Sequence, residues 1–322
     1  MANKHSGADQ LNFETGKKVS LFGMKKNFFL ILFSIFSAQL FAQLPNTDLF
    51  LLNLTWTKKG DLKPEGKPEN LTNRSGYDNQ PSFLPDGETL LFTLADTTGQ
   101  TDIYRLPLQT KIRQNLTQTP ATSEYSAVCL PGSSFFTVVR VEEDGKTQRL
   151  WKFPLSGSPE GNPVLFQPNL PQIGYYYRTP QDTLALFVIT EPPTLQVAGL
   201  TDSAGLVAAT NIGRCLQPIP RQPGTVSFLL KLSNANWLIK RLTLGNLDTQ
   251  TLAPALSGAE DFVWLPDGSL VMGKNSRLFR WQPKQKEWTL MADFSDLNVR
   301  NISRLAINAQ GNKLIFVAEM YK

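Results

Sequence analysis

Short apolar runs alternate with turn-forming residues along the chain from about residue 45 onward, and no segment shows the sustained stripe of a long amphipathic helix. The clearest turn is Leu84-Pro85-Asp86-Gly87, which separates Pro81-Ser82-Phe83 from the apolar run Leu90-Leu91-Phe92. Proline pre-sets φ, aspartate bonds the local backbone and glycine accepts a positive φ, so this segment predicts a tight turn between two strands. The same turn recurs at Leu265-Pro266-Asp267-Gly268.

Weaker copies of this turn bring the number of predicted hairpins to six. The six turn positions are Gly87, Gly132, Asp182, Gly224, Gly268 and Gly311. Their spacings are 45, 50, 42, 44 and 43 residues, which is the period of a four-stranded propeller blade. Asn70-Leu71-Thr72 and Asn115-Leu116-Thr117 also recur, each seventeen residues before a turn glycine.

A third strand follows five of the six hairpins at a regular distance. These strands are expected at residues 102–106, 149–153, 194–200, 237–242 and 277–281. The sixth hairpin lies at the C-terminus, whereas Asp48–Asn53 has the pattern of a third strand without a hairpin of its own. Pairing the two would remove exposed strand edges. The sequence therefore predicts an all-β, six-bladed β-propeller over residues 43–322, closed by pairing of the N- and C-terminal strands.

A secretory signal peptide is expected at residues 24–42. Lys25 and Lys26 precede an apolar run, Phe28–Phe36, which is too short to span a bilayer as a helix. A short segment of small residues then predicts cleavage after Ala42. We expect a periplasmic or secreted product without a membrane anchor, and residues 1–23 are either an upstream extension or a start assigned too early.

The charge and the cysteines narrow the range of partners. Removing the leader lowers Lys+Arg from 32 to 27 and Asp+Glu from 27 to 25, so the net charge falls from +5 to +2. This small excess gives no electrostatic reason to expect nucleic acid as a partner. Cys129 and Cys215 fall on non-adjacent predicted blades, so we expect two buried free thiols instead of a disulfide.

Histidine chemistry is excluded from the mature chain because the only histidine, His5, precedes the leader. This excludes Ser-His-Asp and Cys-His mechanisms and histidine-ligated zinc. The repeated Ser-x-Asp-x-Gly-x-x-Trp boxes of sialidases are also missing. A non-enzymatic role is therefore favoured, with no cofactor, and a calcium site built from carboxylates and amides is the remaining catalytic alternative.

Candidate site residues lie where the innermost strands enter the channel. Counting back seven places from the turns aligns Gln80, Tyr125, Tyr175, Asp261 and Arg304, and Arg214 is placed by matching Ile212-Gly213 to Ile173-Gly174. One position earlier lie Asn79, Glu124 and Glu260. This ring suits a polar or anionic ligand such as a sugar, a peptide or a cell-wall fragment.

The same residues have a structural interpretation, in which Arg214 and Arg304 pair with carboxylates between neighbouring blades and satisfy buried polar groups. In the tyrosine run 175–177 we expect at least one packing residue, while the central Tyr176 could offer a stacking surface for a sugar. Trp151, Trp237 and Trp281 recur on the third strands and are expected in the core.

The residues 71–104 closely resemble one repeat of the TolB-like propellers, the WD40-like or PD40 repeat family, through Leu71-Thr72, Pro85-Asp86-Gly87 and Ile103-Tyr104. The match weakens in the third and fourth predicted blades. The chain is also similar to exported propellers of unassigned function from Bacteroidetes-type bacteria. This resemblance implies the fold and a binding theme, but no chemistry.

Three functions remain open at this point. The first is a non-enzymatic scaffold that binds a polar small molecule, a glycan, a peptide or a cell-envelope protein through the channel mouth. The second is a calcium-dependent hydrolase or lyase of lactonase type, which requires oxygens of Glu124, Glu260, Asp261 and Asn79 to converge on one point. The third is an assembly role that uses blade edges and long loops such as residues 58–67.

Overall fold

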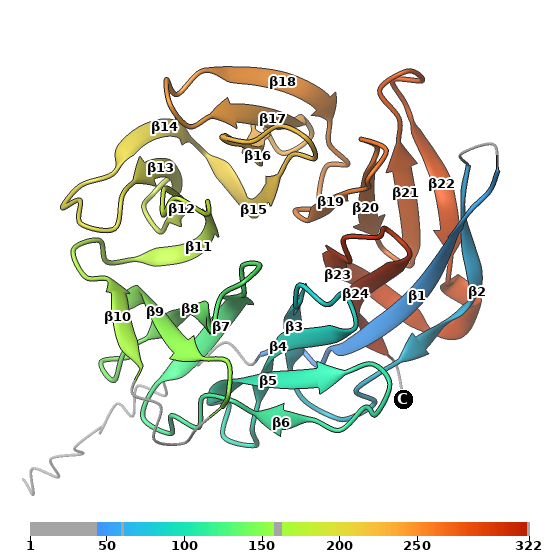
Figure 1. Cartoon of the computed structure of the whole chain (residues 1–322). Helices are drawn as coiled ribbons and strands as arrows, with labels where there is room; N and C mark the ends of the chain where they lie inside the picture. Colours follow the sequence, from blue (N-terminus) through green and yellow to red (C-terminus); the bar gives the residue numbers. More distant parts are fainter. Residues whose placement is uncertain (1–43, 59–60, 158–162, 321–322) are drawn as a thin grey trace, which may run out of the picture. The chain divides into compact units, whose positions relative to one another are not determined.

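The computed structural model describes residues 44–58, 61–157 and 163–320, all within the compact unit Ala42–Lys322. These residues form six four-stranded antiparallel sheets, the blades of a β-propeller (Figure 1). Within the same ranges the helical structure is a 3₁₀ turn, η1 (Ser295–Leu297), and no helix is long and apolar enough to cross a membrane. The expected extension and signal peptide, residues 1–42, lie outside the described residues.

Five blades are formed by consecutive strands, with the first strand of each innermost. Blade 1 contains β3 (Asp78–Phe83), β4 (Thr89–Ala95), β5 (Thr101–Pro107) and β6 (Gln114–Asn115). Blade 2 contains β7 (Ser123–Val128), β8 (Phe135–Val141), β9 (Gln148–Pro154) and β10 (Val164–Gln167). Blade 3 contains β11 (Ile173–Arg178), β12 (Leu184–Val188), β13 (Thr194–Ala198) and β14 (Leu206–Thr210). Blade 4 contains β15 (Ile212–Pro218), β16 (Thr225–Lys231), β17 (Trp237–Thr243) and β18 (Thr249–Pro254), and blade 5 contains β19 (Phe262–Trp264), β20 (Leu270–Lys274), β21 (Arg277–Trp281) and β22 (Trp288–Asp293).

Blade 6 is built from both ends of the chain and confirms the predicted closure. Its order is β2-β1-β24-β23, with β23 (Val299–Ile307) innermost, then β24 (Lys313–Met320), β1 (Asp48–Trp56) and β2 (Leu62–Asn70). Leu49 pairs with Val317 and Leu51 with Ile315 across the junction. Figure 1 shows β1 beside β24. The segment expected as a long loop, residues 58–67, is therefore largely the outer strand β2. That expectation was wrong because its lysine, glycine and proline content resembles a linker, although proline is tolerated on an edge strand.

Among the described residues, the hydrophobic core consists of six clusters, each between two neighbouring blades. Phe50 and Leu52 of blade 6, for example, pack with Val263 and Val271 of blade 5. Corresponding clusters lie between blades 6 and 1, 1 and 2, 2 and 3, 3 and 4, and 4 and 5. Polar side chains of the innermost strands, such as Gln80 and Arg304, line the channel together with apolar ones.

All six predicted turn positions have a positive φ. The value is 68° at Gly87 and 85° at Gly268, in the two clearest turns, and 59° at Asp182, where the sequence departs most from Pro-Asp-Gly. Aspartate tolerates this left-handed conformation better than most residues. The Asp182 amide donates to the Thr179 carbonyl and its carboxylate accepts from Arg178 Nε at 2.6 Å. The poorly matching third blade therefore keeps the same turn geometry.

The two Asn-Leu-Thr copies hold the aspartate that begins, or nearly begins, the neighbouring third strand. Asp102 accepts hydrogen bonds from Asn115 Nδ2 at 2.8 Å, from Thr117 Oγ1 at 2.9 Å and from the Thr119 amide at 3.1 Å. Asp48 accepts the equivalent bonds from Asn70, Thr72 and Arg74. The motif is thus a structural clasp that fixes the outer strand to the third strand.

The two cysteines are buried free thiols on blades 2 and 4, as expected. Cys215 Sγ contacts the backbone of Phe262, and burial raises the pKa of this thiol to about 12. The group therefore remains a neutral packing residue under ordinary conditions.

Candidate functional site

Irregular pairing on the innermost strands turns selected side chains toward the channel. Gln80, Ser126 and Arg304 have φ values of 52°, 53° and 42°, and each lies where the pairing of its strand shifts register. A bulge of this kind bends a strand and re-aims a side chain. Gln80 Oε1 accepts hydrogen bonds from the Ser126 amide at 2.7 Å and from its hydroxyl at 3.2 Å, so two bulges bind each other.

The expected alignment of Tyr125 with Gln80 is shifted by one residue. The positive φ and the bond to Gln80 belong to Ser126, and Ser126 lines the central cavity. Tyr125 instead packs against the apolar cluster between blades 2 and 3. Counting back from the turn misses this because the second blade reaches its bulge one residue later than the first.

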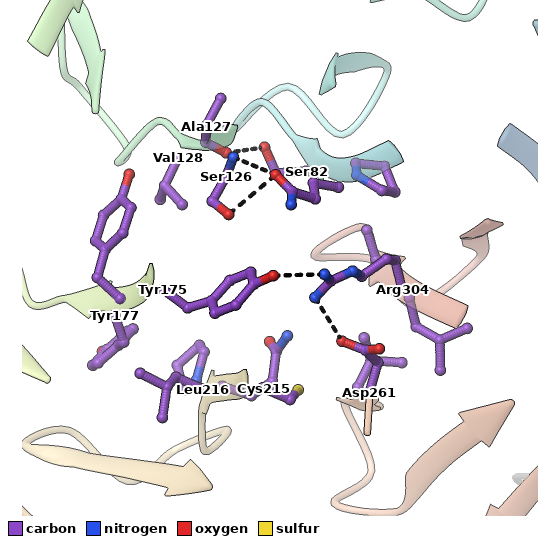
Figure 2. A pocket seen from close by; sticks show the side chains of 18 of the residues that line it. Ser82, Ser126, Ala127, Val128, Tyr175, Tyr177, Cys215, Leu216, Asp261 and Arg304 are labelled. Carbon is purple, nitrogen blue, oxygen red and sulfur yellow. Dashed lines mark hydrogen bonds and ion pairs between the residues drawn. The ribbon is translucent and has the colours of Figure 1, made fainter. Parts of the chain in front are cut away.

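The centre of the site is an ion-pair cluster contributed by blades 3, 4, 5 and 6 (Figure 2). Arg304 Nη2 donates to the Tyr175 hydroxyl at 2.7 Å, and Arg304 Nη1 lies 3.3 Å from Asp261 Oδ1. Arg214 Nη2 lies 2.6 Å from Asp261 Oδ2. The structural interpretation of the two arginines is therefore confirmed for Asp261, which joins blade 4 to blade 6.

The ion-pair cluster of Arg214, Arg304 and Asp261 has a net charge of +1. Two guanidiniums share the single carboxylate of Asp261, while Glu260 pairs separately with Lys231 at 2.5 Å. Burial acts to raise the pKa of Asp261, but the charges of Arg304 and Arg214 outweigh it and hold this pKa below its usual value. Among the described residues, Arg214 Nη1 has no hydrogen-bond acceptor, and 28% of the Arg214 side chain is exposed.

The cluster borders a cavity of about 330 Å³ that is lined by the innermost strands of all six blades and is open to solvent. From Gln80, Tyr175, Arg214, Asp261 and Arg304, the cavity extends along the strands toward the inner hairpin turns. Its wall there is largely apolar. The apolar lining residues include Phe83, Val128, Leu130, Leu216, Val263 and Ile307.

This direction differs from the expectation, which placed the ligand where the innermost strands begin. The apolar wall was missed because its residues follow the ordinary alternation of a strand and look like core in the sequence. The available signal was their place on the innermost strand, two or more positions after the aligned polar residues.

The remaining candidate residues do not line this cavity. Glu124 is fully buried at the start of β7, where it accepts hydrogen bonds from the hydroxyls of Thr119 and Thr122 and lies 3.9 Å from Arg140 Nε. Burial raises the pKa of Glu124 to about 7. Asn79 is also buried and donates to Thr47.

The geometry does not support the calcium site. Glu124, Glu260 and Asp261 each have separate partners: hydroxyls, a lysine and two arginines. In residues 44–58, 61–157 and 163–320, no group of three or more His, Cys, Asp or Glu side chains is arranged to hold a metal. The convergence of oxygens that this hypothesis requires is not found in the described part of the chain.

Several aromatic residues have a different burial or role from the one expected. Tyr176, the central tyrosine, is 7% exposed and donates to Thr137 Oγ1 at 2.7 Å, so it is the packing residue, whereas Tyr175 contacts the arginine cluster. Trp281 is buried as expected. Trp151 and Trp237 are only partly buried, and a cation lies over each ring, Arg140 at 4.3 Å and Lys231 at 4.8 Å.

Comparisons with known proteins identify the fold but not a family. No family model and no curated protein sequence matches the chain. A putative TolB from Agrobacterium tumefaciens shares 14% identity, with a TM-score of 0.62 over 86% of this chain and 99% of that chain. A nidogen/laminin complex gives 9% identity and a TM-score of 0.58 over 86% and 100%. A puromycin-hydrolyzing peptidase from Mycobacterium tuberculosis shares 15% identity, with a TM-score of 0.53 over 81% of this chain and 48% of that chain. The chain is thus an all-β, six-bladed propeller with a TolB-like fold, shared by proteins of different activities.

Proposed function

We propose that this protein is a non-enzymatic binding propeller that takes a ligand with an anionic group at Arg214 and Arg304. The observation that carries the proposal is the unequal pairing of two arginines with one aspartate beside a cavity of about 330 Å³. Arginine presents several donors in a planar fork that matches a carboxylate. The unpaired Nη1 of Arg214 and the exposed part of its side chain supply donors to an incoming anion without breaking the bond to Asp261.

The cluster offers binding groups but no obvious catalytic group. The fully buried Glu124, whose pKa is raised toward neutrality, is bonded within its own strand start and does not border the cavity. Asp261 is held in its ionised form by two arginines, which makes it a poor proton acceptor. These features support a binding role over acid-base catalysis.

Export to the periplasm or medium is part of the same proposal and rests on the signal-like residues 24–42.

The test is thermal unfolding and calorimetric titration of the purified protein with acetate, lactate and glucuronate, each compared with its neutral amide at matched ionic strength. A ligand that binds only the native state raises the melting temperature. We expect the carboxylates to raise it and the amides to have no effect. Arg214→Gln should weaken carboxylate binding at least about tenfold, because a hydrogen bond to a charged group contributes about 1.5–3 kcal/mol.

The matched control is Arg277→Gln, which removes the same charge from a surface pair with Asp293. Carboxylate binding should be unchanged in this variant. Equal effects of acids and amides, or equal effects of the two arginine variants, would contradict the proposal. Stabilisation by calcium chloride alone, abolished by Asp261→Asn, would favour the metal-dependent alternative.

A further inference from the structure

A second cavity lies beside the first and is built from blades 4, 5 and 6. Its volume is about 560 Å³. Its wall is formed by residues 217–221, at and after the end of β15, by Trp264 and Pro266, and by residues 307–309. Gln217, Pro218 and Ile307 line both cavities. The second cavity therefore adjoins the first at the inner hairpin turns of blades 4, 5 and 6.

The second cavity has a largely apolar wall, and several of the polar groups that line it already have partners. Trp264 Nε1 donates to Ser227 Oγ at 2.8 Å, so the indole has only its apolar ring atoms left to offer. Asn308 binds Gly87, Asn312 and Lys313, and Arg221 Nη2 donates to the Pro266 carbonyl at 2.6 Å. The rest of the wall includes three prolines, Pro218, Pro220 and Pro266, which lack an amide donor.

From this arrangement we infer that the ligand is an amphipathic monocarboxylate, with its carboxylate at Arg214 and Arg304 and an alkyl or aryl body that passes Pro218 and Ile307 into the second cavity. This inference rests on the proposed function and names its ligand class. The single excess positive charge matches a monoanion. A peptide or glycan would need further hydrogen-bond partners along its length, whereas an apolar chain needs only the wall that the second cavity provides.

The test is calorimetric titration of the purified full chain with acetate, hexanoate and decanoate, with decanol as the uncharged comparison. Burial of apolar surface strengthens binding with each added methylene. We expect decanoate to bind at least about tenfold more tightly than hexanoate and decanol to bind at least about tenfold more weakly than decanoate.

Two variants locate the alkyl chain. Trp264→Ala removes the aromatic wall and should weaken decanoate binding at least about fivefold while changing acetate binding less than about twofold. Because Trp264 also packs against the cluster between blades 4 and 5, its loss can disturb the fold. Ala309→Phe, at an exposed residue of the second cavity, should selectively weaken decanoate by occupying the space. Trp288→Ala, outside both cavities, is the control and should leave all three ligands unaffected.

The outcomes separate the inference from the proposal on which it rests. Equal affinity for acetate and decanoate, with Arg214→Gln still abolishing both, would overturn the amphipathic ligand and leave anion binding intact. Tighter binding of a glycan or peptide carboxylate than of decanoate would also overturn it. If no carboxylate binds, the proposed function fails as well.

Discussion

Two buried carboxylates of the innermost strands, Glu124 in blade 2 and Asp261 just before β19 in blade 5, have opposite electrostatic surroundings. Glu124 has neutral hydroxyls as its nearest partners, and burial raises its pKa to about 7. Burial also acts on Asp261, but two arginines hold its pKa below the usual value. The difference shows that the neighbouring side chains, and not burial alone, decide whether a buried carboxyl group is ionised.

This contrast also separates structural from functional candidates. Glu124 connects blade 2 to the clasp of blade 1, since Thr119 donates hydrogen bonds to both Glu124 and Asp102. Asp261 connects blades 4 and 6 and borders the cavity. A ligand entering the cavity therefore meets the charged cluster and not the protonatable glutamate.

Of the variants that test this contrast, Asp261→Asn should have the largest effect on the free energy of unfolding. The ionised form of Asp261 stabilises the fold above the unfolded-state pKa, and this stabilisation is lost as the pH falls through the lowered folded-state pKa. We expect a loss of about 3–5 kcal/mol in the free energy of unfolding at pH 7, because two buried guanidiniums lose their shared partner. Urea unfolding at pH 7 and at pH 3 measures this, and the difference from wild type should shrink at pH 3.

The control for this prediction is Asp182→Asn, which affects an aspartate-arginine pair whose carboxylate is 39% exposed. Its effect should stay below about 1 kcal/mol because solvent screens the pair. Similar losses in the two variants would show that the cluster around Asp261 is no more important than a surface pair.

Glu124→Gln should have the next largest effect and the opposite sign. In the unfolded chain the glutamate ionises near 4.5, whereas in the folded chain its pKa is about 7, so stability falls as the pH rises through this window. The variant cannot ionise, and its advantage over wild type should grow by about 2.5 kcal/mol between pH 5 and pH 8. Chemical unfolding at both pH values tests this. Glu88→Gln, at an exposed glutamate, is the control, and its difference in stability from wild type should be the same at both pH values. A constant difference would mean that Glu124 ionises normally in the folded state.

Thr122→Val should have the smallest effect, and it tests how much one hydroxyl partner stabilises the ionised form of Glu124. The Thr122 hydroxyl donates to Glu124 Oε1 at 2.8 Å, and its loss should cost about 1 kcal/mol. The loss should be larger at pH 8 than at pH 5, because the hydroxyl stabilises the ionised carboxylate. Thr98→Val removes an exposed hydroxyl bonded to Asp96 and serves as the control. An identical loss at both pH values would indicate packing instead of hydrogen bonding.

The fold was predictable because its signals are local and repeated. A positive φ at each of six turn positions follows from residues that tolerate it, and the two Asn-Leu-Thr copies recur because each clasps an aspartate of the third strand. The closure was predictable because Asp48–Asn53 had the pattern of a third strand and no hairpin of its own.

The site was only partly predictable because it depends on contacts between blades. Gln80, Tyr175, Arg214, Asp261 and Arg304 do meet at one cavity, but the bulge at Ser126 is fixed by a bond to another blade that counting along one strand does not detect. The sharing of Asp261 by arginines from two blades has no signature in the sequence. The apolar walls likewise resemble core residues until the cavity is seen.

The shared sixth blade also places a constraint on folding. Because β1 pairs with β24, the first strand of the propeller cannot reach its partner until the C-terminal strand has been synthesised. Contacts between residues so far apart in the sequence form slowly, so we expect ring closure to be a late step, with the edges of β1 and β24 exposed until then. Trp56 of β1 donates to the Gly311 carbonyl between β23 and β24, so this hydrogen bond forms only when the ring closes.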